Sequence, residues 1–382
     1  MKKLNTIFSL LMLFFSSCLF AQNFDIYVSD IGGFTTPDPR ILKFDSSGMN
    51  GEVFISQHLA WPQDIVFLED KNEVLISNLN SGRITRYNAG NGDYISNFAT
   101  GLGGPTRMKV RNDTLYVLQW NGDGKVMRFT LEGTPLGAFT DTGVPRSIGL
   151  DWDAEGNLYV SSYGQTSPSI PTLIRKFDTQ GIDQGIFIGS SNLAGPTNIW
   201  FDPSGNGDLL VSDYNSNRIK RFDSTGAYLN DFITGLNLPE GVDFDSEGNI
   251  YIGNGGTDAV KKYTSDGQFI KDIVPSASLG MDIPNVVILR ETTTVSVSEF
   301  EKKIKYIIPT VGTEFFLDTK KSNEILAIEI YNTAGVLVAK SNAENNEIWN
   351  AKGHAEGMYI IRAKTNDGSF WIQKVMVKKM DD

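Results

Sequence analysis

The chain has 382 residues and is long enough for two or three domains, each able to bury an ordinary hydrophobic core. Its formal net charge of −11 at pH 7 disfavours contact with nucleic acid or anionic lipid, so we expect no nucleic acid as a partner. One cysteine and two histidines exclude an intrachain disulfide and a zinc site built from several histidines.

The first predicted element is a secretory signal peptide over residues 1–21. It has a basic start at Lys2 and Lys3, then an apolar run, then the small residue Ala21 before the expected cleavage point. The apolar run is too short to span a bilayer, and no later stretch is apolar enough to form a transmembrane segment. Cleavage before Cys18 with lipidation of that cysteine is the alternative, although the residues before it match the usual context poorly. We expect an exported protein.

The next part of the chain repeats one pattern six times. A short strand that begins with proline recurs, and a second strand such as "DLLVSD" and a third such as "RIKRFD" complete the pattern. In every third strand a basic residue precedes an aromatic one, which predicts a buried ring and a cation on the opposite face. A repeated four-stranded unit of about 40 to 45 residues is typical of a β-propeller. The prolines are Pro62, Pro105, Pro145, Pro196, Pro239 and Pro284.

We therefore predict an all-β fold, with a six-bladed β-propeller over residues 22–291. The first unit lacks its own proline strand, and the extra one at Pro284 would close the ring by pairing with it. The repeats resemble the NHL family and the wider group of SMP-30/gluconolactonase-like propellers, most clearly in "PTNIWFDPSGNGDLLVSDYNSNRIKRFDSTG". This resemblance covers all six units and implies the fold more strongly than the activity.

The tail of the chain differs in pattern. Residues 292–302 are polar and β-branched, as in a linker, and residues 303–382 predict a small antiparallel β-sandwich. The segments "IEIYNTAGVLV", "GMYIIRAKTNDG" and "QKVMVKK" resemble the C-terminal sorting domain of the type IX secretion system. The resemblance implies handling by the type IX secretion machinery and a secreted or outer cell-surface location. The family's usual Asn-Pro near the start is missing, with only Pro309 there. A β-sandwich used for adhesion is the alternative.

The candidate site is the propeller face that carries the loops into the innermost strands and the loops between second and third strands. Aromatic and polar side chains of these loops are suited to stack on, and hydrogen-bond to, a sugar or a peptide. The extended loop "SYGQTSPSIPTL" of the fourth unit is the preferred place for specificity. The predicted ligand-binding residues are Trp61, Gln63, Trp120, Arg146, Tyr163, Thr197, Tyr214 and Asn285.

A metal site is a second expectation, and it comes from the resemblance to SMP-30-like enzymes. Those enzymes hold a divalent cation that activates water and polarises a lactone or an ester. Here the cation would be calcium, magnesium or zinc, bound by Glu240, Asn198, Asn285 and Asp213. Asn and Asp also occur in such loops for turn formation alone, so loop structure is the alternative.

Two functions follow from these patterns. The shortage of catalytic side chains favours a secreted or cell-surface propeller that binds an extracellular glycan, peptide or protein without chemistry. The alternative is a metal-dependent hydrolase of lactones or esters, as the SMP-30 resemblance implies.

Overall fold

A computed structural model divides the chain into two compact units, residues 1–293 and residues 294–382. The predicted signal peptide and residues 293–302 of the predicted linker lie outside the described residues. No described residue belongs to a helix long and apolar enough to cross a membrane. The structure describes residues 24–32, 38–203, 206–292, 307–308, 311–317, 325–332, 336–341, 347–365 and 370–379.

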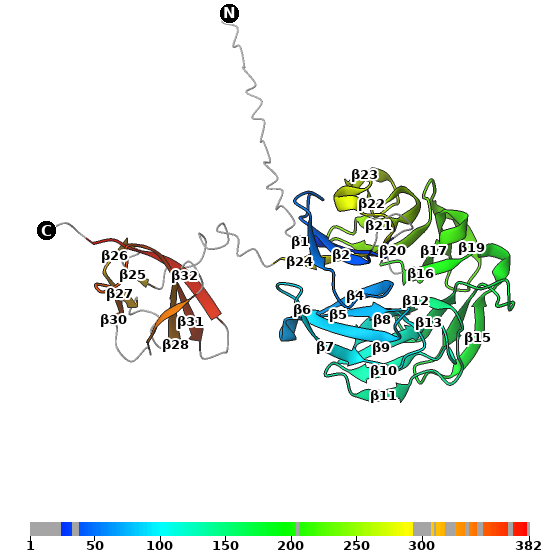
Figure 1. The fold of residues 1–382 in the computed structure, drawn as a ribbon, viewed down its shortest axis with the longest axis horizontal. Helices are drawn as coiled ribbons and strands as arrows, with labels where there is room; N and C mark the ends of the chain where they lie inside the picture. The colour runs from blue at the N-terminus through cyan, green and yellow to red at the C-terminus, as the bar shows by residue number, and fades with distance from the viewer. Residues whose placement is uncertain are drawn as a thin grey trace, which may run out of the picture. The chain divides into compact units, whose positions relative to one another are not determined.

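The first unit is a ring of six four-stranded antiparallel sheets, as the repeats predict (Figure 1). Each sheet is one blade, and its four strands lie side by side, in order from the centre of the ring to its outside. The innermost strands of blades one to six are β24 (Pro284–Glu291), β4 (Pro62–Leu68), β8 (Pro105–Arg111), β12 (Ser147–Trp152), β16 (Pro196–Phe201) and β20 (Pro239–Phe244).

The second strands lie beside the innermost ones, and their side chains are almost fully buried because both faces of each blade pack against neighbouring blades. In blade order they are β1 (Phe24–Asp30), β5 (Glu73–Asn78), β9 (Thr114–Gln119), β13 (Leu158–Ser162), β17 (Leu209–Asp213) and β21 (Ile250–Asn254).

The third strands confirm the predicted alternation of cation and aromatic ring. Their aromatic residues are at most 5% exposed, as for Phe129, while Tyr87, Phe177 and Phe222 are fully buried. In blade order these strands are β2 (Arg40–Phe44), β6 (Arg83–Asn88), β10 (Met127–Thr130), β14 (Leu173–Phe177), β18 (Arg218–Phe222) and β22 (Ala259–Tyr263). The outermost strands are β3 (Glu52–Ile55), β7 (Tyr94–Ala99), β11 (Pro135–Ala138), β15 (Asp183–Ile188), β19 (Tyr228–Ile233) and β23 (Phe269–Val274).

Blade one closes the ring with strands from both ends of the propeller. β24 pairs antiparallel with β1, from Phe24 opposite Glu291 to Asp30 opposite Pro284. The expectation that the extra proline strand completes the first blade is confirmed. The closure gives β1 a partner on its inner edge, where it would otherwise be unpaired.

The start of blade four corrects the sequence-based register. β12 begins at Ser147 rather than at Pro145, because Ser147 pairs with Ser162 as Pro62 pairs with Asn78 in blade two. Arg146 accepts a hydrogen bond from the Tyr163 N–H, as Trp61 does from the Leu79 N–H, so it precedes the strand. The backbone ladder sets the strand start, and the nearby proline is displaced from it by two residues.

Serine side chains on second strands join neighbouring blades. Four hydroxyls donate to carbonyls of the next innermost strand, at distances of 2.6 to 2.9 Å. In blade six this position is Gly253, where an added Cβ would lie 2.7 Å from the Pro284 carbonyl oxygen. The serines are Ser29, Ser77, Ser161 and Ser212.

The second unit contains a five-stranded sheet, ordered β26-β32-β31-β28-β29, and a three-stranded sheet, β25-β27-β30. Its core includes Phe315, Ile330, Trp349 and Ile361. One pair, β26 with β32, is parallel, which departs from the fully antiparallel expectation. The strands are β25 (Ile307–Ile308), β26 (Val311–Gly312), β27 (Glu314–Leu317), β28 (Ile325–Asn332), β29 (Leu337–Ser341), β30 (Glu347–Asn350), β31 (Gly357–Thr365) and β32 (Phe370–Val377).

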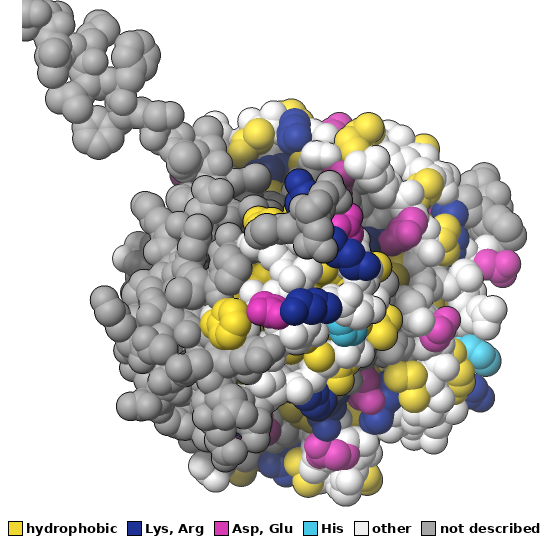
Figure 2. Space-filling view, turned by 90° about the vertical axis from the view of Figure 1, so that its left-hand side faces the viewer, with side chains coloured by type: hydrophobic (Ala, Val, Ile, Leu, Met, Phe, Trp, Pro, Cys, Tyr) yellow, Lys and Arg dark blue, Asp and Glu magenta, His cyan; other side chains and the backbone are white. Residues whose placement is uncertain are grey.

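The charged side chains are dispersed on the face shown in Figure 2. Acidic, basic and hydrophobic groups are interspersed in the coloured part of that surface. The net charge of the chain is therefore not gathered into one patch on this face.

Candidate functional site

The last residue of each second strand secures the loop that leads into the innermost strand. The Asp213 carboxylate accepts hydrogen bonds from the backbone N–H groups of Ala194 and Gly195, the latter at 2.6 Å. It also pairs with Lys220 at 2.7 Å and is fully buried. Asn78 and Asn254 hold their own loops in the same way. Asp213 therefore orders the loops of the face, and its oxygens are engaged there.

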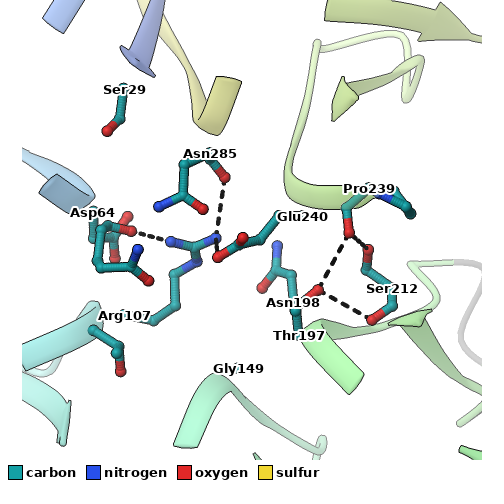
Figure 3. Close-up of polar contacts among 12 residues, drawn as sticks. Ser29, Asp64, Arg107, Gly149, Thr197, Asn198, Ser212, Pro239, Glu240 and Asn285 are labelled. Carbon is teal, nitrogen blue, oxygen red and sulfur yellow. Dashed lines mark hydrogen bonds and ion pairs between the residues drawn. The ribbon is translucent and has the colours of Figure 1, made fainter. Parts of the chain in front are cut away.

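Arg107, from β8, occupies the centre of the ring (Figure 3). Its guanidinium donates to the backbone carbonyl of Gln63 and, at 3.3 Å, to both Glu240 Oε1 and the carbonyl of Asn285. The Arg107 side chain is only 6% exposed and the Glu240 side chain 14%. Groups from blades one, two and six thus converge on one cation.

Three more of the predicted site residues lie near this ion pair in the central channel, the space between the six innermost strands (Figure 3). Asn285 donates from Nδ2 to the Pro62 carbonyl, and its buried Oδ1 has no hydrogen-bond partner among the described residues. Thr197 is buried and donates to the Ser212 carbonyl at 3.1 Å. Asn198 Oδ1 accepts from the Ile199 N–H. Asn285 Nδ2 thus joins two blades, whereas these bonds of Thr197 and Asn198 lie within blade five, and Asn285 Oδ1 is a buried acceptor that a ligand could use.

Burial alters the protonation of the channel carboxyls. Burial raises the pKa of Glu240 to about 7, although the Arg107 charge opposes the shift and Asp64 adds to it. Burial also raises the pKa of Asp64 to about 6, against the charge of Arg107 and a hydrogen bond from the Met108 N–H. Both groups therefore exchange protons near neutral pH.

A cavity of about 290 Å³ lies among all six innermost strands. It is lined by Asp64, Arg107 and Lys109 and, across the ring, by Asn198 and Asp243. Burial raises the pKa of Asp243 to about 6, while hydrogen bonds from the Leu289 and Phe244 N–H groups and the charge of Lys109 oppose the shift. The channel therefore contains mixed charges rather than carboxylates alone.

The four residues expected to bind a metal do not form one donor set. Glu240 is the ion-pair partner of Arg107. The positive charge of that guanidinium would repel a metal ion bound to the same carboxylate. Asp213 is used by two loop amides and Lys220. Among the described residues, no group of three or more His, Cys, Asp or Glu side chains could hold a metal ion. The arrangement does not fit a divalent cation, and we derive no reaction through one.

Three aromatic residues and one arginine on the loops form a separate group, here called the aromatic rim: Trp120, Arg146, Tyr163 and Tyr214. The Arg146 guanidinium lies 5.0 Å from the Trp120 ring centroid and donates to the side-chain oxygens of Gln165 and Asn121. Gln165 belongs to the extended loop between β13 and β14, as expected for the fourth unit. Two amides thus hold the arginine over the indole ring.

The rim continues across blades four and five. Tyr163 lies 5.8 Å from Trp120 and 6.1 Å from Tyr214, between ring centroids, and its hydroxyl donates to Asn215. Burial raises the pKa of Tyr214 to about 12, with smaller contributions from Glu240 and Tyr163. The aromatic rim therefore extends over the loops of blades three, four and five.

Trp61 lies in the loop before β4 and is 41% exposed, with a positive φ of 60°.

Arg107 is the residue that sequence reasoning missed. The corresponding positions of the other blades hold Asp64, Gly149, Asn198, Gly241 and Val286, so the repeat supplies no signal for an arginine there.

Comparisons with known proteins agree with this architecture. Residues 310–378 match the family described as Secretion system C-terminal sorting domain. A structure from a nidogen/laminin complex superposes with a TM-score of 0.57 at 16% identity, covering 70% of this chain and 98% of that chain. A Bacteroides caccae protein of unknown function gives 0.53 at 14% identity, covering 71% and 100%. At such identity these two similarities show the shared propeller fold alone.

A gluconolactonase from Xanthomonas campestris gives a TM-score of 0.46 at 18% identity, covering 56% of this chain and 75% of that one. That score is too low to support a shared activity. No curated protein matches the chain in sequence.

The sorting domain places the protein at the cell surface or outside the cell. The chain is therefore an exported six-bladed β-propeller with a C-terminal region similar to type IX sorting domains.

Proposed function

We propose that the propeller is an extracellular binding protein that takes a glycan on its aromatic rim and performs no chemistry on it. The single observation that carries this proposal is the rim itself, in which Trp120, Tyr163 and Tyr214 form a chain of rings beside the fixed Arg146. Rings with adjacent amide and guanidinium groups suit a ligand that has both apolar faces and hydroxyls.

The amides beside the rim support the same ligand class. Asn121, Gln165 and Asn215 each already contact a rim residue and retain further donor or acceptor capacity for hydroxyls. The mixed charges of the channel, with Arg107 at their centre, speak for binding rather than for metal-dependent hydrolysis.

The test is a glycan array with the purified protein, followed by calorimetry on the best ligand. Trp120→Ala and Tyr163→Ala should each weaken binding at least fivefold, because each removes a stacking ring worth about 1 to 3 kcal/mol. Tyr228→Ala is the matched control, since Tyr228 is an exposed tyrosine on the outermost strand β19.

Binding that is unaffected by both rim substitutions would contradict the proposal. Binding of peptides in place of glycans would assign the rim to a protein partner. Metal-dependent turnover of a lactone or an ester would favour the hydrolase instead.

A further inference from the structure

Tyrosines of the second strands fill several junctions between blades. At the junction of blades four and five, the Tyr159 ring lies 4.8 Å from Phe187 and 5.0 Å from Phe201. Its hydroxyl donates to Asp153 at 3.1 Å, and Lys176 lies 5.0 Å from the ring centroid. The ring thus occupies a slot with two aromatic walls, a carboxylate and a cation.

Parts of this arrangement recur at other junctions. Tyr27 lies between Phe54 and Phe67, with centroid distances of 5.1 and 4.8 Å. Tyr251 donates its hydroxyl to Asp245 at 3.1 Å, beneath Lys262. In blades one, four and six the chain itself therefore places a phenol ring at this position of the repeat, whereas blade two has the buried Leu75, paired with Arg86.

The junction of blades five and six has the slot without the tyrosine. Leu210 of β17 pairs with Arg221, as Tyr159 pairs with Lys176, so the two residues occupy the same position of the repeat. Phe232 of β19 and Phe244 of β20 stand where Phe187 and Phe201 stand. A leucine is shorter than a tyrosine and has no hydroxyl, so it cannot reach the polar end of the slot.

A cavity of about 610 Å³ is found at this junction. Its lining includes Leu210, Phe232 and Phe244 and, at the polar end, Asp202 and Arg221. Arg221 pairs with Asp202 at 2.7 Å, the counterpart of the pair between Lys176 and Asp153. The walls and the charged pair are present, and the space is larger than one ring requires.

Trp200 supplies a second observation at this cavity. Its side chain lines the cavity and is 5% exposed, and its buried Nε1 has no hydrogen-bond partner among the described residues. A buried donor without an acceptor is costly, so a ligand that offers an oxygen there gains affinity.

We propose that the cavity between blades five and six binds a para-substituted phenol. The ring takes the place of the missing tyrosine between Phe232 and Phe244, and its hydroxyl donates to Asp202 as Tyr159 donates to Asp153. The volume beyond one ring accommodates the para substituent. This site is separate from the aromatic rim and does not depend on it.

Calorimetry of the full chain with p-cresol and with toluene tests the proposal. p-Cresol should bind with one site per chain and at least tenfold more tightly than toluene, which has no hydroxyl to donate. Leu210→Tyr should abolish p-cresol binding and raise the melting temperature, because the new side chain fills the slot. Leu229→Tyr is the matched control, as Leu229 is 47% exposed on β19 and should leave p-cresol binding unchanged.

Asp202→Asn provides a second test that does not depend on filling the cavity. It should reduce the preference for p-cresol over toluene by at least threefold. N-acetyl-L-tyrosinamide distinguishes the source of the phenol, since its binding would admit a tyrosine side chain of a peptide and its failure would restrict the site to small phenols. Absence of p-cresol binding, equal binding of toluene, or undiminished binding by Leu210→Tyr would overturn the proposal.

Discussion

Arg107 is the residue on which the polar interior of the ring depends. It is nearly buried and compensates Glu240 and Asp64, two carboxyls that burial has made weaker acids. A buried ion pair is weak evidence for net stability, but removal of one partner leaves the other uncompensated. The two carboxyls should therefore control how the propeller responds to pH.

The pH prediction concerns Glu240→Gln. The folded pKa of Glu240 is about 7 and its ordinary value is 4.5, so the folded protein holds this proton more tightly than the unfolded chain. The corresponding stability is fully present below pH 4.5 and is lost as the pH rises through 7. Between pH 4.5 and 8 the wild type should lose about 3 kcal/mol more than Glu240→Gln, measured by urea unfolding.

Glu52→Gln, which removes a carboxylate that is 60% exposed, is the control for lost surface charge. Arg107→Met should have the opposite effect and steepen the loss of stability with pH, because Glu240 and Asp64 then lack their cation. Parallel pH profiles for the wild type and Glu240→Gln would refute the assignment.

At the scale of strands and blades, the serine hydroxyls and Gly253 show how the blades are spaced. A serine fits where its hydroxyl reaches the next blade's carbonyl, whereas at blade six the closing strand β24 leaves no room for a side chain. Close packing of this kind tolerates little added volume.

Gly253→Ala should therefore cost about 1 to 3 kcal/mol of unfolding free energy, because its Cβ would lie 2.7 Å from the Pro284 oxygen. Gly189→Ala is the matched control, since Gly189 has a φ of −88° and no atom within 4 Å of an added Cβ. Equal urea midpoints for the two variants would show that β24 can shift away from β21.

The sequence predicts the elements well and the interior poorly, for a physical reason. Strand order, ring closure and the buried third-strand rings follow from a pattern repeated six times. The start of β12 was misplaced because Pro145 imitates a strand position that Ser147 holds. The role of Arg107 could not be predicted, because its contact with Glu240 depends on how blades three and six face each other across the ring. The sequence of a single repeat does not contain that information. The ion pair therefore needs the closed ring to be seen.

For the whole molecule, the division into two units predicts separable roles. Removal of residues 294–382 should leave a propeller that melts in one transition, because its core lies within residues 24–291. The same truncation should abolish appearance at the cell surface and in the medium, followed by cell fractionation and immunoblotting. The full chain with Arg107→Met is the control for misfolding, because it carries a destabilised propeller and keeps the tail. Its export would show that loss of export in the truncated chain does not come from a less stable propeller. Normal export of the truncated chain would contradict a sorting role for the tail.

The pairing of β1 with β24 has a consequence for the order of events during synthesis. β1 has no partner on its inner side until residues 284–291 have been synthesised, so ring closure is the last step in the assembly of the propeller. The sorting domain follows this closing strand along the chain. A chain whose synthesis stops before residue 284 therefore lacks both the closing strand and the sorting domain.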